Sequence, residues 1–571
     1  MAFHIVSLFL AIGITPWLIS QLLFQRHSRG MTLAGWGPVM ISINVAIPIT
    51  LHLLAIPITP NSLAFAHGIL AVLVGCIFFV FKKPVPLDTP DLLSKRLLAL
   101  SGILFALLVL PLTHIAGIDT YKWQDLASNI AVEQRISWLI HPFSLLGFTP
   151  RSYSSAQPLV LASIQLLGHT GVDWGFYLLS LVFGLTGFTG AWVLGRYLFK
   201  SDTSASWLAI LYMFSPVFMR YNYWATGRGL LLALLPAYLL ILLKLGKSLA
   251  GRKDHSLSSL LWLIPAWLLM TGLIMMSHKA GVIGAVLIPS LFVVSPALWL
   301  LRGRWGLWIA VLFALAVGLL LADKQPLMFT TRLITRFGWL LPLAFLALAT
   351  APDRLQTPPI RTLLVAGLGT LALSCTPDMY GALLALPFMA CMATIGLEKI
   401  FLSQRLENSS LRTLRASVQT LLGSSYVGLA IILIPALAIV LNQMRDSPSE
   451  PVYQAAQFIE QYDPRGPFQI EAPGPARHQI QGYVSGCPRF TVHANATARM
   501  AFNSPPPVTG HLARDARQWI DFLRGMLDLR GANTDWYGEG SKVYYITIDG
   551  LGTVPQNAKR LFATGNVAVF E

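Results

Sequence analysis

Acidic, basic and aromatic side chains gather in one long loop between two apolar segments, residues 117–173. Directly after a hydrophobic run this loop carries Asp119, Tyr121 and Lys122, and Asp125 follows. A carboxylate at the end of a membrane helix is held in place by a rigid backbone, as a general base must be. Asp119 is therefore the first candidate for a catalytic residue and Asp125 the second. The alternative is that each acid is a solvated helix end or the partner of a nearby cation.

Two arginines and several aromatic residues form a second polar turn, residues 220–228. A guanidinium group can bind two phosphate oxygens at once, so Arg220 and Arg228 suit a phosphate, and Tyr223 suits the face of a sugar beside it. Together with Tyr121, these residues are candidates for a substrate pocket. The alternative is an ordinary belt of aromatic residues at a membrane interface.

Three further polar turns interrupt the apolar runs. His278 and Lys279 stand between two runs with almost no loop around them, and ionisable groups at membrane depth are functional candidates. Arg332 and Arg336 are four residues apart, so a helix places them on one face, where they can bind a lipid phosphate. Asp378 is a further candidate for the pocket. The alternatives are a plain turn at His278 and Lys279, snorkelling of the arginines toward ordinary lipid head groups, and a Pro-Asp turn at Asp378.

The composition indicates the elements that must carry these turns. The chain has 571 residues, of which 55% are hydrophobic and 12% are charged, whereas soluble domains carry about 25% charged residues. Its repeated apolar runs approach the roughly 20 residues that cross a bilayer. The sequence therefore predicts a polytopic α-helical membrane protein in contact with the lipid bilayer. The net charge is +16, but the Lys and Arg residues are spread over short loops, so no nucleic acid partner is expected.

The apolar runs and their basic flanks predict about fourteen membrane helices. They lie near residues 3–24, 37–57, 62–81, 97–117, 174–199, 205–220, 228–245, 258–276, 280–301, 305–322, 338–351, 362–376, 380–398 and 416–441. Most loop cations fall in one alternate set of loops, which the positive-inside rule assigns to the cytoplasm. Both termini and the loop 117–173 are then extracytoplasmic. The inner membrane of a bacterium is the expected location.

Three regions follow from this pattern. Residues 1–96 are additional N-terminal membrane helices, and residues 97–441 form the membrane core. Residues 442–571 have ordinary charge density, a helical pattern at 453–461 and an alternating strand at 542–548, which predict an extracytoplasmic soluble α/β domain. Within the long outer loop, the apolar stretch 155–168 is short for a span and is expected to be an amphipathic or re-entrant helix at the outer interface.

The four cysteines show no spacing typical of a metal site. Cys76 and Cys391 fall inside apolar runs and are expected to be small buried residues. Cys375 and Cys487 both fall on the expected outer side, which leaves a disulfide between them open.

The order of these features resembles that of a known superfamily. An acid outside a span, an outer loop with a short helix, a long helix ending in Leu-Gly-Arg-Tyr-Leu-Phe at 194–199, the segment 205–216 and the aromatic-Arg turn at 220–228 follow one another. This order is similar to that of the GT-C superfamily of polyprenol-dependent glycosyltransferases, such as protein O-mannosyltransferases, the aminoarabinose transferase of lipid A and the catalytic subunit of oligosaccharyltransferase. The resemblance is best over residues 115–250 and weaker to about residue 400.

The resemblance implies sugar transfer from a polyprenyl phosphate at the outer membrane face, with Asp119 as the residue that assists the acceptor nucleophile. In this sequence the acid follows the fourth predicted span instead of the first, and Thr120 stands where a second acid is expected. The second outer turn lacks the acidic motif of metal-dependent members. No cofactor is therefore firmly predicted, and a divalent metal is open but not favoured.

The sequence thus predicts an inverting membrane glycosyltransferase that uses a polyprenyl-phosphate-linked sugar as donor and a glycan, lipid or protein as acceptor. Asp119 is the expected base; His278, Lys279, Arg332 and Arg336 are expected to bind the donor phosphate. The C-terminal domain is expected to recognise the acceptor or to bind a protein partner. Two alternatives stand beside this hypothesis: a transporter or flippase of lipid-linked sugars, and a non-catalytic subunit of a complex that assembles cell-envelope glycans.

Overall fold

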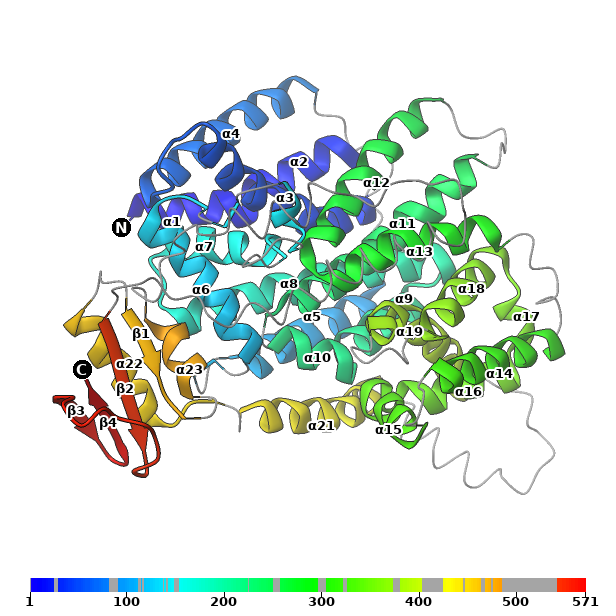
Figure 1. Ribbon diagram of the computed structural model, residues 1–571. Coiled ribbons are helices and arrows are strands. Elements are labelled where there is room, and N and C mark those ends of the chain that lie inside the picture. The colour runs from blue at the N-terminus through cyan, green and yellow to red at the C-terminus, as the bar shows by residue number, and fades with distance from the viewer. Residues whose placement is uncertain are drawn as a thin grey trace, which may run out of the picture.

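The computed structural model consists of a large helical bundle and a small α/β domain at one end of it (Figure 1). It describes residues 2–24, 29–81, 91–110, 114–115, 118–136, 138–139, 142–147, 154–223, 225–249, 257–295, 304–321, 326–372, 380–402, 425–444, 447–463, 468–473, 476–484 and 542–571. Cys375, Cys487 and Asp378 lie outside these residues. A disulfide between Cys375 and Cys487 therefore stays open, and the pocket role of Asp378 stays a prediction.

Six helices of the described residues are long and apolar enough to cross a membrane. They span His4–Leu23, Thr32–Leu53, Pro60–Val80, Val172–Phe199, Gly227–Leu249 and Tyr380–Lys399. Six shorter apolar helices pack among them: Ala156–Gly168, Trp262–Ser277, Lys279–Val294, Gly306–Ala316, Leu340–Thr350 and Gly428–Met444. The predicted class, a helical membrane protein with many spans, is confirmed, whereas the number of about fourteen spans stays a prediction.

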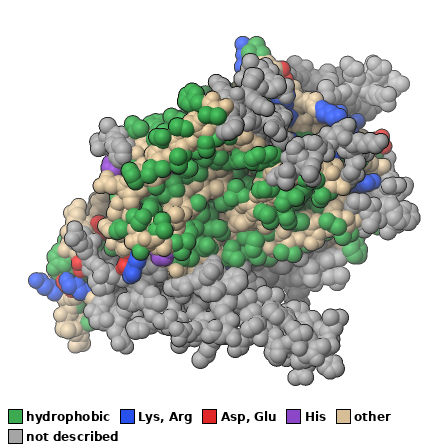
Figure 2. All heavy atoms as spheres, turned by 90° about the horizontal axis from the view of Figure 1, so that it is seen from above, with side chains coloured by type: hydrophobic (Ala, Val, Ile, Leu, Met, Phe, Trp, Pro, Cys, Tyr) green, Lys and Arg blue, Asp and Glu red, His purple; other side chains and the backbone are tan. Residues whose placement is uncertain are grey.

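The surface of the bundle is apolar where lipid would contact it. Large side chains such as Phe79, Val80 and Val293 are between 75% and 83% exposed. Figure 2 shows hydrophobic side chains across the middle of one face, with the charged side chains gathered toward its ends. A broad apolar surface of this kind is costly in water and favourable in a bilayer. Cys76 is part of this exposed surface of α4, so the expectation that it is buried is wrong, while Cys391 is buried as expected.

The N-terminal helices pack as one group. The helix α1 (Ala2–Phe9) continues through a π-helical turn at Leu10–Ile14 into α2 (Thr15–Phe24), which packs on α3 (Arg29–Leu53) and α4 (Pro60–Phe81). Between the π-helical turn and α3, the side-chain amide of Asn44 donates to the carbonyl of Ala11 over 3.2 Å. A hydrogen bond of this kind joins helices where lipid offers no competing partner.

The predicted span at 97–117 ends early in the structure. The helix α5 (Leu92–Leu108) begins at Asp91, whose carboxylate accepts from the Ser94 backbone N–H over 2.7 Å. A separate helix, α6 (Ile118–Glu133), then begins in the long polar loop that follows. Asp119 therefore lies in the first turn of α6, not at the end of a membrane span. The prediction that the end of a membrane helix holds this acid is wrong.

The apolar stretch near residue 155 forms α7 (Ala156–Gly168), as predicted. All but three of its 13 residues are buried, and it packs against α3, α6 and α8 (Val172–Phe199). A helix that is hydrophobic on every side belongs inside a protein, because an amphipathic surface helix keeps one polar face. The amphipathic form of the prediction is therefore wrong, whereas the re-entrant form stays a prediction.

The predicted span at 205–220 is two helices, α9 (Asp202–Met213) and α10 (Pro216–Tyr223). The break occurs at Ser215 and Pro216, because proline has no N–H to continue the helix and fits the first position of a new one. The Ser215 hydroxyl accepts from the Phe218 backbone N–H over 3.2 Å, which satisfies a donor at the start of α10. This break turns the Arg-aromatic segment away from the axis of α9.

The remaining helices complete the bundle and lead to the C-terminal domain. They are α11 (Gly227–Leu249), α12 (Leu257–Ser277), α13 (Lys279–Val294), α14 (Arg304–Leu321), α15 (Pro326–Phe337), α16 (Leu340–Thr350), α17 (Pro352–Leu355), α18 (Pro358–Ala372), α19 (Tyr380–Leu402) and α21 (Ser425–Met444). The helices α8, α9, α11 and α19 are buried on most sides and form the centre of the bundle.

Among its described residues, the C-terminal region forms a four-stranded sheet covered by two helices, which confirms the α/β part of the predicted fold class. The strands β1 (Phe468–Glu471), β2 (Lys542–Ile548), β3 (Arg560–Thr564) and β4 (Val567–Phe570) lie in the order β1-β2-β4-β3. Only β1 and β2 are parallel. The helices are α22 (Glu450–Tyr462) and α23 (Ala476–Tyr483). Buried Tyr544 and Ile546 alternate along β2 and pack with Val452 and Ile459 of α22.

Candidate functional site

Helix α6 stands between the C-terminal domain and the membrane bundle (Figure 1). On one side, α23 reaches Tyr121: a Cβ added to Gly482 would lie 2.4 Å from the Tyr121 ring. On the other side, Trp123 contacts the start of α11 and the end of α12. Residues two positions apart in an α-helix are separated by about 200° around its axis. Tyr121 and Trp123 therefore face opposite directions. The helix that carries the candidate acids therefore joins both parts of the molecule.

Gly227 allows three helices to meet at this point. A Cβ on Gly227 would lie 1.9 Å from the Trp123 ring and 2.2 Å from the carbonyl oxygen of Ser277. Both distances are far below a normal carbon contact, so only glycine permits this approach. The contact brings the start of α11, which carries Arg228, beside the junction of α12 and α13, which carries His278 and Lys279.

Two arginines lie over the ring of Tyr221, and a third, Arg220, precedes this tyrosine in the chain. Arg336 of α15 donates a hydrogen bond to the Tyr221 hydroxyl, and its guanidinium carbon lies 5.1 Å from the centre of the Tyr221 ring. The Arg228 guanidinium carbon lies 5.2 Å from the same centre. Burial lowers the pKa of Arg336, and the positive charges of Arg220 and Arg228 act in the same direction. Such a cluster favours an anion, because each guanidinium offers several donors to phosphate oxygens.

His278 and Lys279 form the junction between α12 and α13. His278 is buried, and its Nδ1 accepts from the Ala280 backbone N–H over 3.1 Å, which caps the start of α13. The neutral imidazole therefore carries its proton on Nε2. Its ring meets Tyr380 edge-on at a centroid distance of 5.2 Å. Lys279 begins α13 and is half-buried. This junction lies beside Gly227, so it is close to the Arg228 end of the arginine cluster.

The two candidate acids differ in their position on α6. Asp119 lies in the first turn of α6, four residues before Trp123. Asp125 follows Tyr121 by four residues, on the face toward the C-terminal domain. The side chain of Asp119 lies outside the described part. Burial raises the pKa of Asp125 to about 8, although part of the residue remains accessible. At neutral pH, Asp125 therefore holds its proton and suits hydrogen-bond donation better than proton abstraction.

The other predicted pocket residues are spread over several places. Tyr121 is buried against α23, and its hydroxyl donates to the carbonyl of Ile115 over 2.6 Å, so it stabilises the domain contact rather than the arginine cluster. Tyr223 is half-buried at the end of α10, next to the cluster. Arg332 lies one turn before Arg336 in α15, and its side chain is outside the described part. The sequence also missed Tyr221, which links Arg228 to Arg336.

A second polar cluster, which the sequence did not indicate, joins the bundle to the C-terminal domain. Asp173, in the first turn of α8, accepts from His114 Nδ1 over 3.1 Å, from the Ile115 backbone N–H over 2.9 Å and from the Tyr483 hydroxyl over 2.7 Å. His114 also stacks on Tyr453 at a centroid distance of 3.6 Å. His114 was missed because the apolar run around it predicts a membrane span through residue 117.

The hydrogen bond to Asp173 raises the pKa of His114, and Glu450, 3.7 Å from its Nε2, acts in the same direction. Burial opposes this shift. A protonated His114 therefore binds two acids from different parts of the protein. Beside this cluster lies a cavity of about 600 Å³, lined by residues of α8, α22 and α23.

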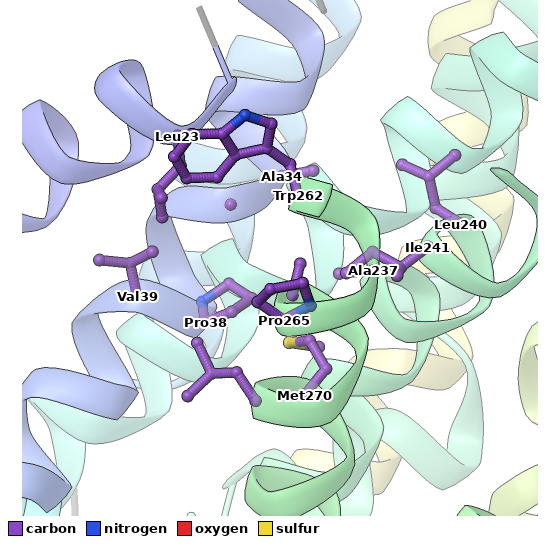
Figure 3. Close-up of a pocket in the computed structure, with 13 residues that line it drawn as sticks. Leu23, Ala34, Pro38, Val39, Ala237, Leu240, Ile241, Trp262, Pro265 and Met270 are labelled. Atoms are coloured by element: carbon purple, nitrogen blue, oxygen red, sulfur yellow. The ribbon is translucent and has the colours of Figure 1, made fainter. Parts of the chain in front are cut away.

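An apolar hollow lies between α2, α3, α11 and α12 (Figure 3). Its walls include Val39, Leu240, Trp262 and Met270, and its volume is about 160 Å³. Of the residues that line it, none is titratable. A hollow of this chemistry can hold hydrocarbon but provides no acid, base or phosphate-binding group.

Among the described residues, no three His, Cys, Asp or Glu side chains lie together in a group that could hold a metal ion. Whether the protein binds a divalent metal therefore stays open, as in the sequence analysis.

A scan against protein-family models and a search of curated proteins gave no match. Among solved structures, the chain is similar to the oligosaccharyltransferase AglB from Archaeoglobus fulgidus in complex with an inhibitory peptide and a dolichol-phosphate. The TM-score is 0.41 at 13% identity, over 80% of this chain and 69% of that chain. It is also similar to ArnT from Cupriavidus metallidurans bound to undecaprenyl phosphate, with a TM-score of 0.47 at 12% identity, over 83% and 97%. Both are GT-C superfamily enzymes. The similarity concerns the fold and assigns no role to any residue of this chain.

Proposed function

We propose that the chain is a membrane glycosyltransferase that takes a sugar from a polyprenyl-phosphate-linked donor and transfers it to an acceptor at the extracytoplasmic face. The observation that carries the proposal is the arginine cluster: Arg220, Arg228 and Arg336 lie around Tyr221, beside the contact of α6 with α11 and α12. A cluster of cations that could bind a phosphate thus lies near the helix that carries the candidate acids.

The cations suit the leaving group of this reaction. When the bond between the anomeric carbon and the phosphate oxygen breaks, its electron pair stays on the phosphate, which becomes more negative. Groups that are already oriented toward developing charge stabilise a transition state without further reorganisation. Arg336 is oriented in this way, since it is half-buried and held by Tyr221. Lys279 is the further candidate, on the other side of the Gly227 contact.

The base is assigned to Asp119. The acceptor hydroxyl must transfer its proton to the carboxylate of Asp119 while its oxygen attacks the anomeric carbon from the face opposite the phosphate, which inverts the configuration. Asp119 and Trp123 are four residues apart in α6, a spacing that puts two helix positions on the same face. Asp125 faces the C-terminal domain, and its raised pKa leaves it protonated at neutral pH. For these reasons Asp119 is preferred to Asp125.

The bilayer restricts where such a reaction can occur. The lipid tail of a polyprenyl donor remains in hydrocarbon while its phosphate stays at the interface, so the phosphate site must lie at the end of the spans. The orientation proposed from the loop charges puts the arginine cluster and the C-terminal domain outside the cytoplasm. The inner membrane of a bacterium is the proposed location.

The experiment is a comparison of outer-surface glycans and glycoproteins by mass spectrometry in cells that carry the gene, lack it, or carry Asp119→Asn or Arg336→Ala. Asp119→Asn is expected to lower the sugar modification at least a hundredfold, because general base catalysis contributes about 10²–10⁴. Arg336→Ala is expected to lower it by a similar factor, because loss of one group that stabilises developing charge costs about 10²–10³. Each variant has a matched control. Asp549→Asn changes an acid in a turn where its φ of 53° suits asparagine, and Arg135→Ala removes an arginine whose side chain is 65% exposed.

The outcomes separate the proposal from its alternatives. A modification that persists at normal level in well-expressed Asp119→Asn contradicts the assignment of the base. Transfer by the purified protein in detergent, where no second compartment exists, excludes pure transport. A gene deletion that leaves every glycan unchanged contradicts the proposed function.

A further inference from the structure

The cavity between α8 and the C-terminal domain is separate from the arginine cluster. Its volume of about 600 Å³ falls within the roughly 300–1,000 Å³ of small-molecule sites. The bundle contributes His114, Asp173 and Trp174, and the C-terminal domain contributes Tyr453, Gln457 and Glu460. Because both parts of the protein form its walls, the cavity exists only while the C-terminal domain is docked.

The walls of the cavity combine rigid aromatic rings with polar side chains. Tyr453 is fixed between His114, which stacks on it, and Tyr483, which meets it edge-on at a centroid distance of 5.0 Å. Trp174 is 54% exposed at the rim. The amide of Gln457 is exposed, and within the described residues it makes no hydrogen bond. Aromatic faces cover the C–H surfaces of a sugar ring, while amides and carboxylates exchange hydrogen bonds with its hydroxyl groups.

The charge of the cavity limits the class of ligand. Asp173 and Glu460 are acidic, and among the described residues that line the cavity His114 is the only basic one. A phosphate or a carboxylate would therefore meet like charges, which costs free energy in a partly desolvated site. A neutral sugar meets no such cost, and an amino sugar gains an attraction. This is the opposite of the arginine cluster, which favours anions.

The cavity and the arginine cluster lie on opposite sides of α6. Tyr483, which lines the cavity, contacts Tyr121 at a centroid distance of 6.3 Å, whereas Trp123 contacts Gly227 beside Arg228. A glycan held in the cavity would therefore lie against the side of α6 that faces the C-terminal domain, near the first turn of the helix that carries Asp119.

We infer that this cavity binds a neutral or amino-sugar glycan, as the site that holds the acceptor of the transfer. The role as an acceptor site rests on the proposed function, but the binding of the glycan does not. The cavity would thus select uncharged or cationic saccharides over phosphorylated and acidic ones.

The test is binding of the full-length protein in nanodiscs, without donor, to an array of immobilised neutral, amino-sugar, acidic and phosphorylated oligosaccharides. Binding is expected to neutral or amino-sugar glycans. Gln457→Ala and Glu460→Gln are each expected to weaken it by at least tenfold, and Gln457→Arg should weaken amino-sugar binding most. Gln356→Ala, a glutamine next to α17 and outside the cavity, is the matched control and should bind as the unmodified protein does.

Three outcomes overturn the inference: no binding to any neutral or amino-sugar glycan, preference for acidic or phosphorylated glycans, or binding that all three cavity variants retain. Thermal unfolding of each variant verifies that the fold is kept, and Glu460→Gln preserves the shape of its side chain. Binding that depends on Gln457 in a protein without transferase activity would contradict the proposed function alone. Transfer without binding in this cavity would contradict the present inference alone.

Discussion

The contact of His114 with Asp173 and Glu450 predicts that docking of the C-terminal domain depends on pH. The hydrogen bond to Asp173 raises the pKa of His114 above 6.5. The stabilisation that protonated His114 gives to docking is therefore complete below about pH 6.5. It is lost as the pH rises through the raised pKa that His114 has in the folded protein. Among the described residues, Tyr453 and Tyr483 also face His114, and burial keeps the Tyr483 phenol neutral across this range.

The perturbation is His114→Gln, which keeps a hydrogen-bonding side chain but removes the titration. A hydrogen bond to a charged group contributes about 1.5–3 kcal/mol. The lower end of this range applies, because the side chains of His114 and Asp173 are 24% and 22% exposed and Asp173 keeps its bonds to Ile115 and Tyr483. A loss of about 1.5 kcal/mol corresponds to roughly a tenfold change in the docking equilibrium.

The assay is hydrogen exchange of the backbone amides of α22 and α23 in nanodiscs between pH 5.5 and 8.5, expressed as protection factors. Protection in the unmodified protein should fall as the pH rises, and His114→Gln should be about tenfold less protected at low pH and nearly independent of pH. Ser447→Ala is the matched control, since it removes a donor to the His114 carbonyl without changing a titrating group. It should lower protection but keep the pH dependence. The reasoning is refuted if protection rises with pH, or if His114→Gln keeps the pH dependence of the unmodified protein.

Three further predictions follow from the environment of α6. Gly227→Ala should lower the melting temperature and abolish transfer, because overpacking of a tight contact costs about 1–3 kcal/mol; Gly246→Ala, in the same helix with no atom within 4 Å of the added Cβ, should be neutral or stabilising. Asp125→Asn should raise the melting temperature at pH 8 but hardly at pH 4, because a carboxyl whose pKa is raised to about 8 destabilises the fold progressively above its ordinary value of 3.8; an equal effect at both pH values would contradict its burial as the cause. Tyr221→Phe should weaken transfer less than Arg336→Ala does, because phenylalanine keeps both ring contacts and loses only the hydroxyl that Arg336 binds; equal losses of product in the mass spectra would show that the hydroxyl itself is required.

The helical class and the C-terminal domain follow from local patterns, and these could be predicted. Long apolar runs cross a bilayer whatever surrounds them, and alternation along residues 542–548 specifies a half-buried strand by itself. Helix breaks were harder to predict. The apolar run from α9 to α10 reads as one span, because a single proline, Pro216, hardly changes the mean hydropathy of such a run. A second apolar run in the same way extends the predicted span past the end of α5 at Leu108 to residue 117.

The candidate site was predicted only in part. Charged residues between apolar runs are functional candidates by their residue type alone. Arg220, Arg228, Arg336 and Lys279 could be predicted in this way. Which of them meet depends on contacts between segments far apart in the chain, such as that of Tyr221 with Arg336. The cavity could not be predicted, because its walls come from α8, α22 and α23. No local sequence pattern indicates that these helices pack together.

The strand order of the C-terminal domain has a practical consequence for protein engineering. The last strand, β4, is hydrogen-bonded on both edges, to β2 and to β3. Deletion of its few residues would leave β3 without a neighbour in the sheet and would open an edge of β2 to intermolecular pairing. An affinity tag is therefore better inserted in the exposed segment 553–558, ahead of β3, than used to replace the residues of β4.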